Sequence, residues 1–232
     1  PELFAKKLGI SKEALELYFD CEVIDPHTVS YIWKRVFGYD LEKKHKYRPF
    51  GIGFLNQVDF PKTLEANMAG VVWDITTNPL HHEKNRLEII RRNIDSILSD
   101  LNKNSDNFQF VRTYADYLEA RKNNKVASWI SIQGGQGIQN NVDDLDKIPE
   151  VHRITLVHFT HSKIGVSNFE TKKNEGLSSF GKNFVEKMID NKIMIDLSHI
   201  NRKGFFNALD IIPKDIPVSV THSGIKGVFD IW

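Results

Sequence analysis

Ile193-Met-Ile-Asp-Leu-Ser-His199 is a short, mostly apolar run that ends in a histidine. Two other runs have the same form, Arg153-Ile-Thr-Leu-Val-His158 and Pro217-Val-Ser-Val-Thr-His222. Each is typical of a buried strand, and each strand places its histidine at its C-terminal end. In a parallel α/β barrel these ends meet on the face that carries the active site. Because imidazole is the commonest metal-ligating side chain, the pattern predicts a metal-dependent enzyme.

The expected strands alternate with helices along the chain. We expect principal strands at 22–25, 70–77, 125–132, 153–158, 193–198 and 217–221, with a minor strand at 108–111. Helices are expected after Ser11, over 83–103, from Thr113 to about 123, over 179–191 and near 202–209, and a loop-rich stretch from Pro26 to about residue 58. The alternation predicts an α/β fold with a TIM-barrel-like (β/α) architecture. A barrel of eight strands takes about 250 residues. Since the sequence stops at Trp232, we expect about six of the eight strands, or an open sheet.

The composition is that of an ordinary globular protein. The 232 residues carry a net charge of +1, so overall charge suggests neither a nucleic acid nor an anionic membrane as a partner. No Pro/Gly/Ser-rich linker divides the chain, and we expect a single domain over 1–232. Cys21 is the only cysteine, which excludes an intrachain disulfide and favours the cytoplasm. No apolar run reaches the roughly 18 residues of a membrane span, and no signal peptide is visible after Pro1, so we expect a soluble protein.

A single histidine near a strand end is usually a hydrogen-bonded core or loop residue. Three at equivalent ends favour a ligand cluster, and Asp25-Pro-His27 closes the first expected strand in the same way. Carboxylate and imidazole together suit a metal such as zinc. The glycine-rich segment Gln133-Gly-Gly-Gln-Gly137 lacks the lysine and the Ser/Thr of a P-loop, so it predicts a tight turn rather than a phosphate cradle.

Six motifs follow one another in a fixed order. They are Asp25-Pro-His-Thr-Val29, Ile132-Gln-Gly-Gly135, Arg153-Ile-Thr-Leu-Val-His158, Gly176-Leu-Ser-Ser-Phe-Gly181, Ile195-Asp-Leu-Ser-His199 and Pro217-Val-Ser-Val-Thr-His-Ser223. From about residue 22 to the end, this series resembles the renal (membrane) dipeptidase family, whose members are zinc-dependent barrels related to the amidohydrolases. The chain resembles a divergent member that is shortened at its C-terminus.

The resemblance implies a role for each matching position. His199 and His222 would hold one zinc ion, and His27 would hold a second together with residue 29. Residue 133 would bridge the two ions, and His158 would contact the tetrahedral intermediate. The implied reaction is the hydrolysis of dipeptides or related small amides by metal-activated water.

Two of the implied ligands are changed in this sequence. Val29 offers no donor atom where the family has Asp, and Gln133 is a neutral amide where the family has a bridging Glu. Two divalent cations about 3.5–4 Å apart repel strongly, so we expect one or two zinc ions with a weakened second site. The family's late aspartate, which carries the proton, and its substrate-binding arginine have no counterpart before Trp232.

Two alternatives to a dipeptidase-like hydrolase therefore stay open. Val29 and Gln133 favour a non-catalytic or one-metal relative that binds a small ligand. A one-metal enzyme of the wider amidohydrolase group, acting on another amide, is the second alternative. Each has a small molecule as its partner, and a homodimer is one assembly compatible with each.

Overall fold

A computed structural model describes residues 2–45, 58–77, 85–160, 162–169 and 174–224. The chain divides into two compact units, the first formed by Pro1–Val72 with Leu101–Trp129, the second by Trp73–Asp100 with Ile130–Trp232. Strands β2 (Gly70–Thr76) and β4 (Val126–Gln133) each have their first half in the first unit and their second half in the second. We describe each unit by itself, and the single domain expected over 1–232 stays a prediction.

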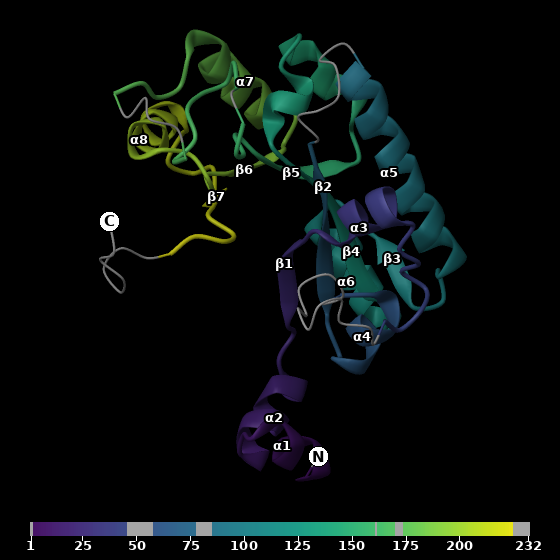
Figure 1. The fold of residues 1–232 in the computed structure, drawn as a ribbon. Helices are drawn as coiled ribbons and strands as arrows, with labels where there is room; N and C mark the ends of the chain where they lie inside the picture. Colours follow the sequence, from purple (N-terminus) through teal and green to yellow (C-terminus); the bar gives the residue numbers. More distant parts are fainter. Residues whose placement is uncertain (1, 46–57, 78–84, 161, 170–173, 225–232) are drawn as a thin grey trace. The chain divides into compact units, whose positions relative to one another are not determined.

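The first unit combines short helices with the beginnings of the sheet strands (Figure 1). Its elements are α1 Glu2–Leu8, α2 Lys12–Asp20, β1 Ile24–Thr28, α3 Ser30–Phe37, α4 Phe60–Glu65, β3 Phe108–Phe110 and α6 Tyr114–Lys122. The strand order is β1-β2-β4, and β3 pairs with β4 in parallel. Ser11 caps α2 and Thr113 caps α6, where the sequence predicts that these helices begin. The structure adds a capping box between Thr113 and Asp116.

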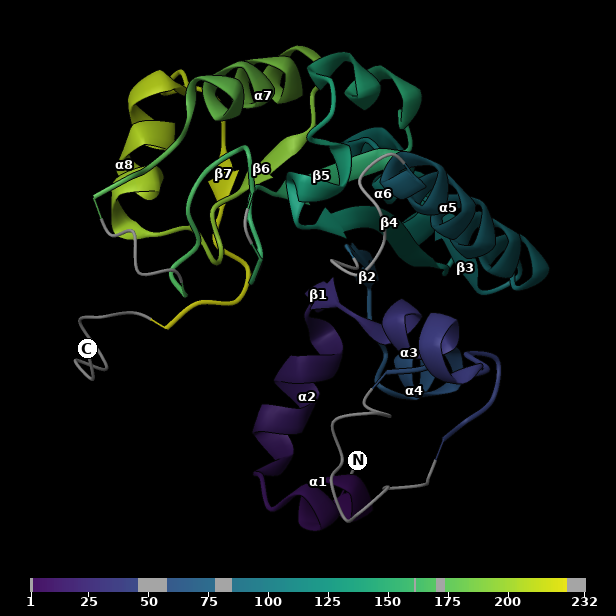
Figure 2. The same cartoon turned by 45° about the horizontal axis from the view of Figure 1, so that its top comes forward.

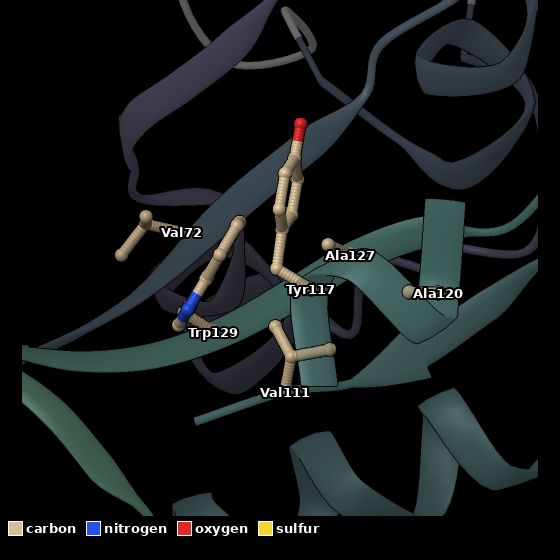
Figure 3. Packing of buried hydrophobic residues seen from close by; sticks show 6 residues of the cluster. All are labelled: Val72, Val111, Tyr117, Ala120, Ala127 and Trp129. Carbon is tan, nitrogen blue, oxygen red and sulfur yellow. The ribbon is translucent and has the colours of Figure 1, made fainter. Parts of the chain in front are cut away.

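An aromatic core holds α6 in place in the first unit. Tyr117 stacks on Trp129 with ring centroids 5.7 Å apart. Its hydroxyl donates to the Glu22 carboxylate at 2.6 Å. Burial, followed by this hydrogen bond to Glu22, raises the pKa of Tyr117 to about 12. Figure 3 shows the full cluster, which consists of Val72, Val111, Tyr117, Ala120, Ala127 and Trp129.

Two predictions for the first unit are wrong. The expected strand 22–25 is displaced, because β1 runs through Pro26 and His27 instead of ending before them. Among the described residues β1 is the terminal strand of the order, and a proline is tolerated in such a strand where its position needs no ladder hydrogen bond. The expected loop from Pro26 to about residue 58 contains α3, which ends at the left-handed Gly38 (φ 65°) and stacks Trp33 on Phe37.

The second unit is a run of parallel strands with helices between them. It contains the later halves of β2 and β4 and most of α5 (Arg86–Lys103). Its other elements are the 3₁₀ helices η4 Gly135–Ile138 and η5 Val142–Lys147, β5 Val151–Thr155, α7 Ser179–Asp190, β6 Met194–Asp196, α8 Arg202–Ile211 and β7 Val218–Ser219. The strand order is β2-β4-β5-β6-β7, and β4 to β7 pair in parallel. This arrangement confirms the predicted α/β fold with βα units.

The last three strands are shorter than the sequence predicts. β5 ends at Thr155 rather than at His158, and β6 and β7 end at Asp196 and Ser219. Leu156 and Val157, which follow β5, are fully buried without continuing the strand. Apolar composition reports burial rather than strand geometry, so a run of apolar residues extends beyond the end of the strand.

Helix α7 covers β6 and packs against α8 (Figure 2). It lies within the helix expected over 179–191, and its buried residues include Phe184, Val185 and Met188. Gly181 allows the close approach of α7 to the preceding loop, because a Cβ there would lie 1.9 Å from the carbonyl oxygen of Ile164. Within the described residues, no helix is long and apolar enough to span a membrane.

Candidate functional site

The register of the parallel strands brings their C-terminal ends to one level. Gln133 pairs with Thr155, Thr155 with Asp196, and Asp196 with Ser219. These four residues are the last of β4, β5, β6 and β7. Three of the four strands carry a predicted histidine three residues after that end. These histidines are His158, His199 and His222.

Three of the predicted metal-site residues converge in the second unit. The Nε2 atoms of His199 and His222 lie 2.7 Å apart. The Gln133 side-chain nitrogen lies 3.1 Å from Nε2 of His222 and 3.4 Å from Nε2 of His199. The two imidazole rings meet at a steep angle, 66°, with centroids 4.7 Å apart. Both rings therefore direct the same nitrogen toward one point beside the Gln133 amide.

His199 adopts a backbone conformation that is uncommon for a non-glycine residue. Its φ is +66°, in the left-handed region. The backbone there is fixed on both sides, since the Asn168 N–H donates to the His199 carbonyl at 2.8 Å and Ser167 forms an antiparallel bridge with Ile200. Strained residues of this kind cluster at functional sites, because the surrounding structure must hold them in place.

Gln133 is 5% exposed, and a hydroxyl fixes its orientation. Its Oε1 accepts a hydrogen bond from Thr76 Oγ1 at 3.1 Å, so its NH₂ group faces the two histidines. An NH₂ group cannot ligate a metal. A rotation of the Gln133 side-chain amide by 180° exchanges its oxygen and nitrogen without changing the shape of the side chain. The oxygen then faces the two histidines, and the Thr76 hydroxyl accepts a hydrogen bond from the NH₂ group.

The donor set fits one metal ion after a small movement. Two nitrogens bound to a tetrahedral zinc ion at 2.0–2.1 Å lie roughly 3.3 Å apart, and the two Nε2 atoms lie at 2.7 Å. A separation of the rings by about 0.6 Å therefore makes room for the ion. In the described part of the chain, no group of three or more His, Cys, Asp and Glu residues has the geometry of a metal site. The His199–His222 pair thus depends on the Gln133 oxygen or on water to complete an ion's coordination.

The ring of His158 lies next to the histidine pair. Its ring is edge-on to that of His199, with centroids 4.7 Å apart, and its side chain is largely buried. Two exposed aromatic residues, Phe159 and Phe169, pack edge to face against each other and lie 4.9 and 6.2 Å from the His199 ring. This arrangement agrees with the expectation that His158 faces a bound substrate rather than the metal, which stays a prediction.

One buried carboxylate joins the two loops that carry His199 and His222. Asp196 Oδ1 accepts from the backbone N–H and the hydroxyl of Ser198, at 3.1 and 2.8 Å, and from the Thr221 N–H at 3.3 Å. Its Oδ2 accepts from the Thr221 hydroxyl at 2.8 Å and from the Thr155 hydroxyl at 2.9 Å. The residues that precede both histidines are thereby tied to the end of β6.

A second buried carboxylate and one arginine complete this network. Arg153 donates to both carboxylate oxygens of Asp74 at 3.1 Å, and its Nε lies 3.7 Å from Asp196 Oδ2. Burial alone would raise the pKa of Asp196. Hydrogen bonding to the Ser198 backbone, the charge of Arg153 and the hydroxyls of Thr221 and Ser198 outweigh burial and hold that pKa below its ordinary value. Asp196 is therefore ionised at neutral pH.

Three charged residues of this network, Asp74, Arg153 and Asp196, are not among the predicted site residues, and Arg153 is expected only as the start of a strand. The signal was present, because each is a charged residue inside an otherwise apolar strand run. All three are at most 2% exposed. Charged residues are almost never buried unless paired, so opposite charges in neighbouring buried runs predict an ion pair between them.

The glycine-rich segment after β4 turns directly into the 3₁₀ helix η4, in agreement with the predicted tight turn. The N–H groups of Gly134 and Gly135 donate to the carbonyls of Thr155 and Leu156, at 3.1 and 3.2 Å. Gly134 has a φ of +101°, a conformation that L side chains rarely adopt. Because these backbone donors are engaged with β5, they are not directed at a ligand.

The residues expected to hold a second ion belong to the first unit. His27 lies on β1, and its N–H donates to the Asp25 carboxylate at 2.9 Å. The Thr28 hydroxyl donates to the same carboxylate at 2.7 Å. Val29 is the N-cap residue of α3 and makes no side-chain capping hydrogen bond. The role of His27 as a ligand stays a prediction.

Fold and site together define an α/β protein of parallel strands with a histidine cluster at their C-terminal ends. The family model of the membrane dipeptidases, peptidase family M19, matches residues 12–231. The chain belongs to this family, which confirms the resemblance drawn from its motifs.

Individual relatives are distant and longer than this chain. The sequence is 25% identical over 193 residues to an uncharacterized protein in the PQQ-III 3' region of Acinetobacter calcoaceticus, covering 73% of this chain and 61% of that protein. It is 22% identical over 201 residues to the dipeptidase tcpJ of Claviceps purpurea, covering 80% of this chain and 45% of that protein. The chain therefore spans about half of these curated relatives.

Solved structures show the same fold. The probable dipeptidase PvdM from Pseudomonas aeruginosa has a TM-score of 0.72 at 17% identity, covering 94% of this chain and 56% of that one. A metallo peptidase from Rhodobacter sphaeroides, liganded with a phosphinate mimic of the dipeptide L-Ala-D-Ala, has a TM-score of 0.70 at 20% identity, covering 89% and 66%. These likenesses confirm the TIM-barrel-like architecture.

Proposed function

We propose that this chain carries a zinc site of a dipeptidase-like hydrolase that acts on dipeptides or related small amides. His199 and His222 hold the ion through their Nε2 atoms, and the Gln133 side-chain oxygen is the third protein donor. A bound zinc ion supplies an activated water and polarises the amide carbonyl. The observation that carries the proposal is the convergence of the two Nε2 atoms, 2.7 Å apart, beside the Gln133 amide.

His158 is the residue that we propose to contact the reacting amide. It follows β5 at the level of the two ligands, and its ring lies edge-on to His199. An imidazole placed there donates a hydrogen bond to the oxygen that becomes negative as water adds to the carbonyl. The dipeptide mimic bound by the Rhodobacter sphaeroides metallo peptidase supports a dipeptide as the substrate class.

The zinc proposal is tested by metal binding to the full-length protein. Titration with zinc, followed by calorimetry, should give one tight site that is lost in His199→Ala and in His222→Ala. His152→Ala is the matched control, because His152 lies near the N-terminal end of β5, away from the paired C-terminal ends. Equal zinc binding by all three variants would refute the assignment of the ligands.

Activity is tested separately on the same proteins. The zinc-loaded full-length protein should hydrolyse L-Ala-D-Ala or another dipeptide from a panel, and His158→Ala should lower kcat with little change in zinc affinity. Turnover of other amides only, with no dipeptide cleaved, would identify an amidohydrolase of different specificity. Zinc binding without turnover on any substrate would overturn the hydrolase proposal.

A non-catalytic or one-metal relative is the second candidate function. Two observations favour it, namely the NH₂ group that Gln133 turns toward the histidines and the apolar Val29 at the start of α3. Two carboxylates suit a pair of ions where an amide and an alkyl group do not. The full-length double variant Val29→Asp with Gln133→Glu should therefore bind a second zinc ion and gain activity if only ligands are missing.

This test needs a control for helix capping. An Asp at position 29 also supplies an N-cap side chain to α3, which stabilises a helix by about 1 kcal/mol without any metal. Val29→Asn with Gln133→Glu supplies a similar cap without the carboxylate at position 29. A second ion in the Asp variant but not in the Asn variant would identify the carboxylate as the cause. No second ion and no activity in either would place the loss of function elsewhere in the chain.

A further inference from the structure

A hydroxyl links the buried Asp196 carboxylate to the imidazole of His222. Thr221 Oγ1 lies 2.8 Å from Asp196 Oδ2 and 2.8 Å from His222 Nδ1. Nε2, on the far side of the ring, is the atom that lies 2.7 Å from His199 Nε2. Thr221 therefore contacts Nδ1 of His222, the ring nitrogen that faces away from His199.

Counting protons assigns the direction of each hydrogen bond. An ionised carboxylate only accepts, so the single Thr221 hydroxyl proton points to Asp196. The hydroxyl oxygen then accepts from His222, which requires a proton on Nδ1. A neutral His222 consequently has its lone pair on Nε2, directed at His199 and Gln133.

The carboxylate is well placed to enforce this direction. Asp196 is fully buried, and Arg153, which is 2% exposed, lies within ion-pair distance of its Oδ2. The Thr221 backbone is fixed as well, because its N–H donates to the Ser198 hydroxyl at 3.0 Å. Thr221 is thus held both at its hydroxyl and at its backbone N–H in the geometry that suits the Nδ1–H tautomer of His222.

We infer that Thr221 is a positioning residue that holds His222 as its Nδ1–H tautomer and so presents the Nε2 lone pair to a metal. The inference rests on the proposed zinc site for its purpose, but the tautomer is a property of the metal-free chain. Hydrogen bonds of this kind to the second nitrogen of a ligating histidine orient the ring and raise its basicity.

The test compares three variants of the full-length protein. Thr221→Val removes the hydroxyl and keeps the branched shape, whereas Thr221→Ser keeps the hydroxyl. Thr155→Val is the matched control, because the Thr155 hydroxyl donates to the same Asp196 Oδ2, at 2.9 Å, without contacting a histidine in any described interaction. Similar thermal unfolding of the two valine variants shows that they are equally folded.

The first readout is the tautomer of His222 in metal-free protein labelled with ¹⁵N-histidine. Its ring nitrogen shifts, assigned by comparison with a His222→Gln spectrum, should report Nδ1–H in the parent, in Thr221→Ser and in Thr155→Val. Thr221→Val should show a mixture of tautomers or the Nε2–H form. A parent-like spectrum for Thr221→Val, or the same change in Thr155→Val, would overturn the inference.

The second readout is the dissociation constant for zinc. It should rise by about 10–100-fold in Thr221→Val and return close to the parent value in Thr221→Ser. If the tautomer responds as expected but the parent binds no zinc, the positioning role of Thr221 stands and the proposed function fails. If the parent binds zinc but the His222 signals do not respond to Thr221→Val, the positioning role fails and the proposed function stands.

Discussion

Replacing Arg153 with methionine should destabilise the protein far more than replacing an exposed arginine. Arg153 is 2% exposed and donates to both oxygens of Asp74, a fully buried carboxylate, at 3.1 Å. It also donates to the Ser131 hydroxyl at 3.1 Å and lies 3.7 Å from Asp196. Arg153→Met fills much of the same space but leaves two buried carboxylates without their cation.

The size of the effect follows from breaking a buried pair. Removing one partner of a buried ion pair costs about 3–5 kcal/mol, because the other charge stays buried and uncompensated. For a chain of this size, about 2–4 °C of melting temperature are lost per kcal/mol, so Tm should fall by roughly 6–20 °C. Urea unfolding followed by circular dichroism measures the free energy, and a thermal scan measures Tm.

The matched control is Arg92→Met. Arg92 pairs with Glu88 at 2.8 Å, a shorter distance than in the buried pair, but both side chains are more than two-thirds exposed. Exposed pairs four residues apart on a helix contribute about 0.3–0.5 kcal/mol. If Arg153→Met cost no more than Arg92→Met, burial of the network would not be the source of the energy and the reasoning would be refuted.

A second arm separates the lost charge from the lost packing. Adding Asp74→Asn to Arg153→Met removes one uncompensated carboxylate while its oxygen can still accept from Ser131. Since the penalty comes from the unpaired charge, the double variant should recover at least about 1 kcal/mol relative to Arg153→Met alone. No recovery would mean that packing around the guanidinium, rather than charge, accounts for the loss.

Three further predictions concern stability and pH. Gly181→Ala should cost more than about 3 kcal/mol, because its Cβ would lie 1.9 Å from the backbone oxygen of Ile164, and Gly224→Ala, whose Cβ meets nothing, is the control. Thr113→Ala should cost about 1 kcal/mol by removing the α6 cap, as chemical unfolding will show, and an unchanged midpoint would contradict that role. The lowered pKa of Asp196 contributes stability that is present above its unfolded value of about 4 and is lost as the pH falls through the folded value. The stability difference between the parent and Asp196→Asn should therefore shrink below about pH 4, and a difference that did not vary with pH would contradict the assignment.

Much of the second unit could be predicted because its signals are strong and local. β2 and β4 are continuous buried runs, and α5 repeats its apolar residues at helical spacing, so hydrophobic periodicity identifies all three. One helix of the first unit, α6, has an equally local signal, because its N-cap residue Thr113 marks its start. Such features depend on residues a few positions apart, which the sequence displays directly.

The first unit was harder to predict because its elements are short and mixed. α3 has eight residues, and only Ser30 and Tyr31 are buried, so it lacks the apolar stripe that distinguishes a helix from a loop. β1 contains a proline, which normally argues against a central strand, and among the described residues β1 is the terminal strand of the order. In both cases tertiary context outweighs the local signal.

The histidine cluster could be predicted in part because parallel strands align their ends. A chain that places His199 and His222 three residues past neighbouring strands brings them to the same level whatever the details of the loops. The orientation of each ring could not be predicted in this way. It depends on hydrogen bonds from Thr221 to Asp196 and Ser198, and the pairing of residues more than 20 positions apart leaves no local pattern.

The buried network beneath the histidines is better explained by positioning than by stability. Replacing a buried ion pair with well-packed apolar residues is often neutral or stabilising, so a core of leucine and methionine would hold these strands as firmly as Asp74, Arg153 and Asp196 do. Such a core would offer no acceptor to the hydroxyls of Ser198 and Thr221, which precede the two histidines that we propose as ligands. The charged network adds little net stability, but it fixes both histidine loops. A site that depends on two aligned imidazole nitrogens needs such a network. We therefore expect the Asp74–Arg153–Asp196 network to affect zinc affinity even under conditions in which every variant remains folded.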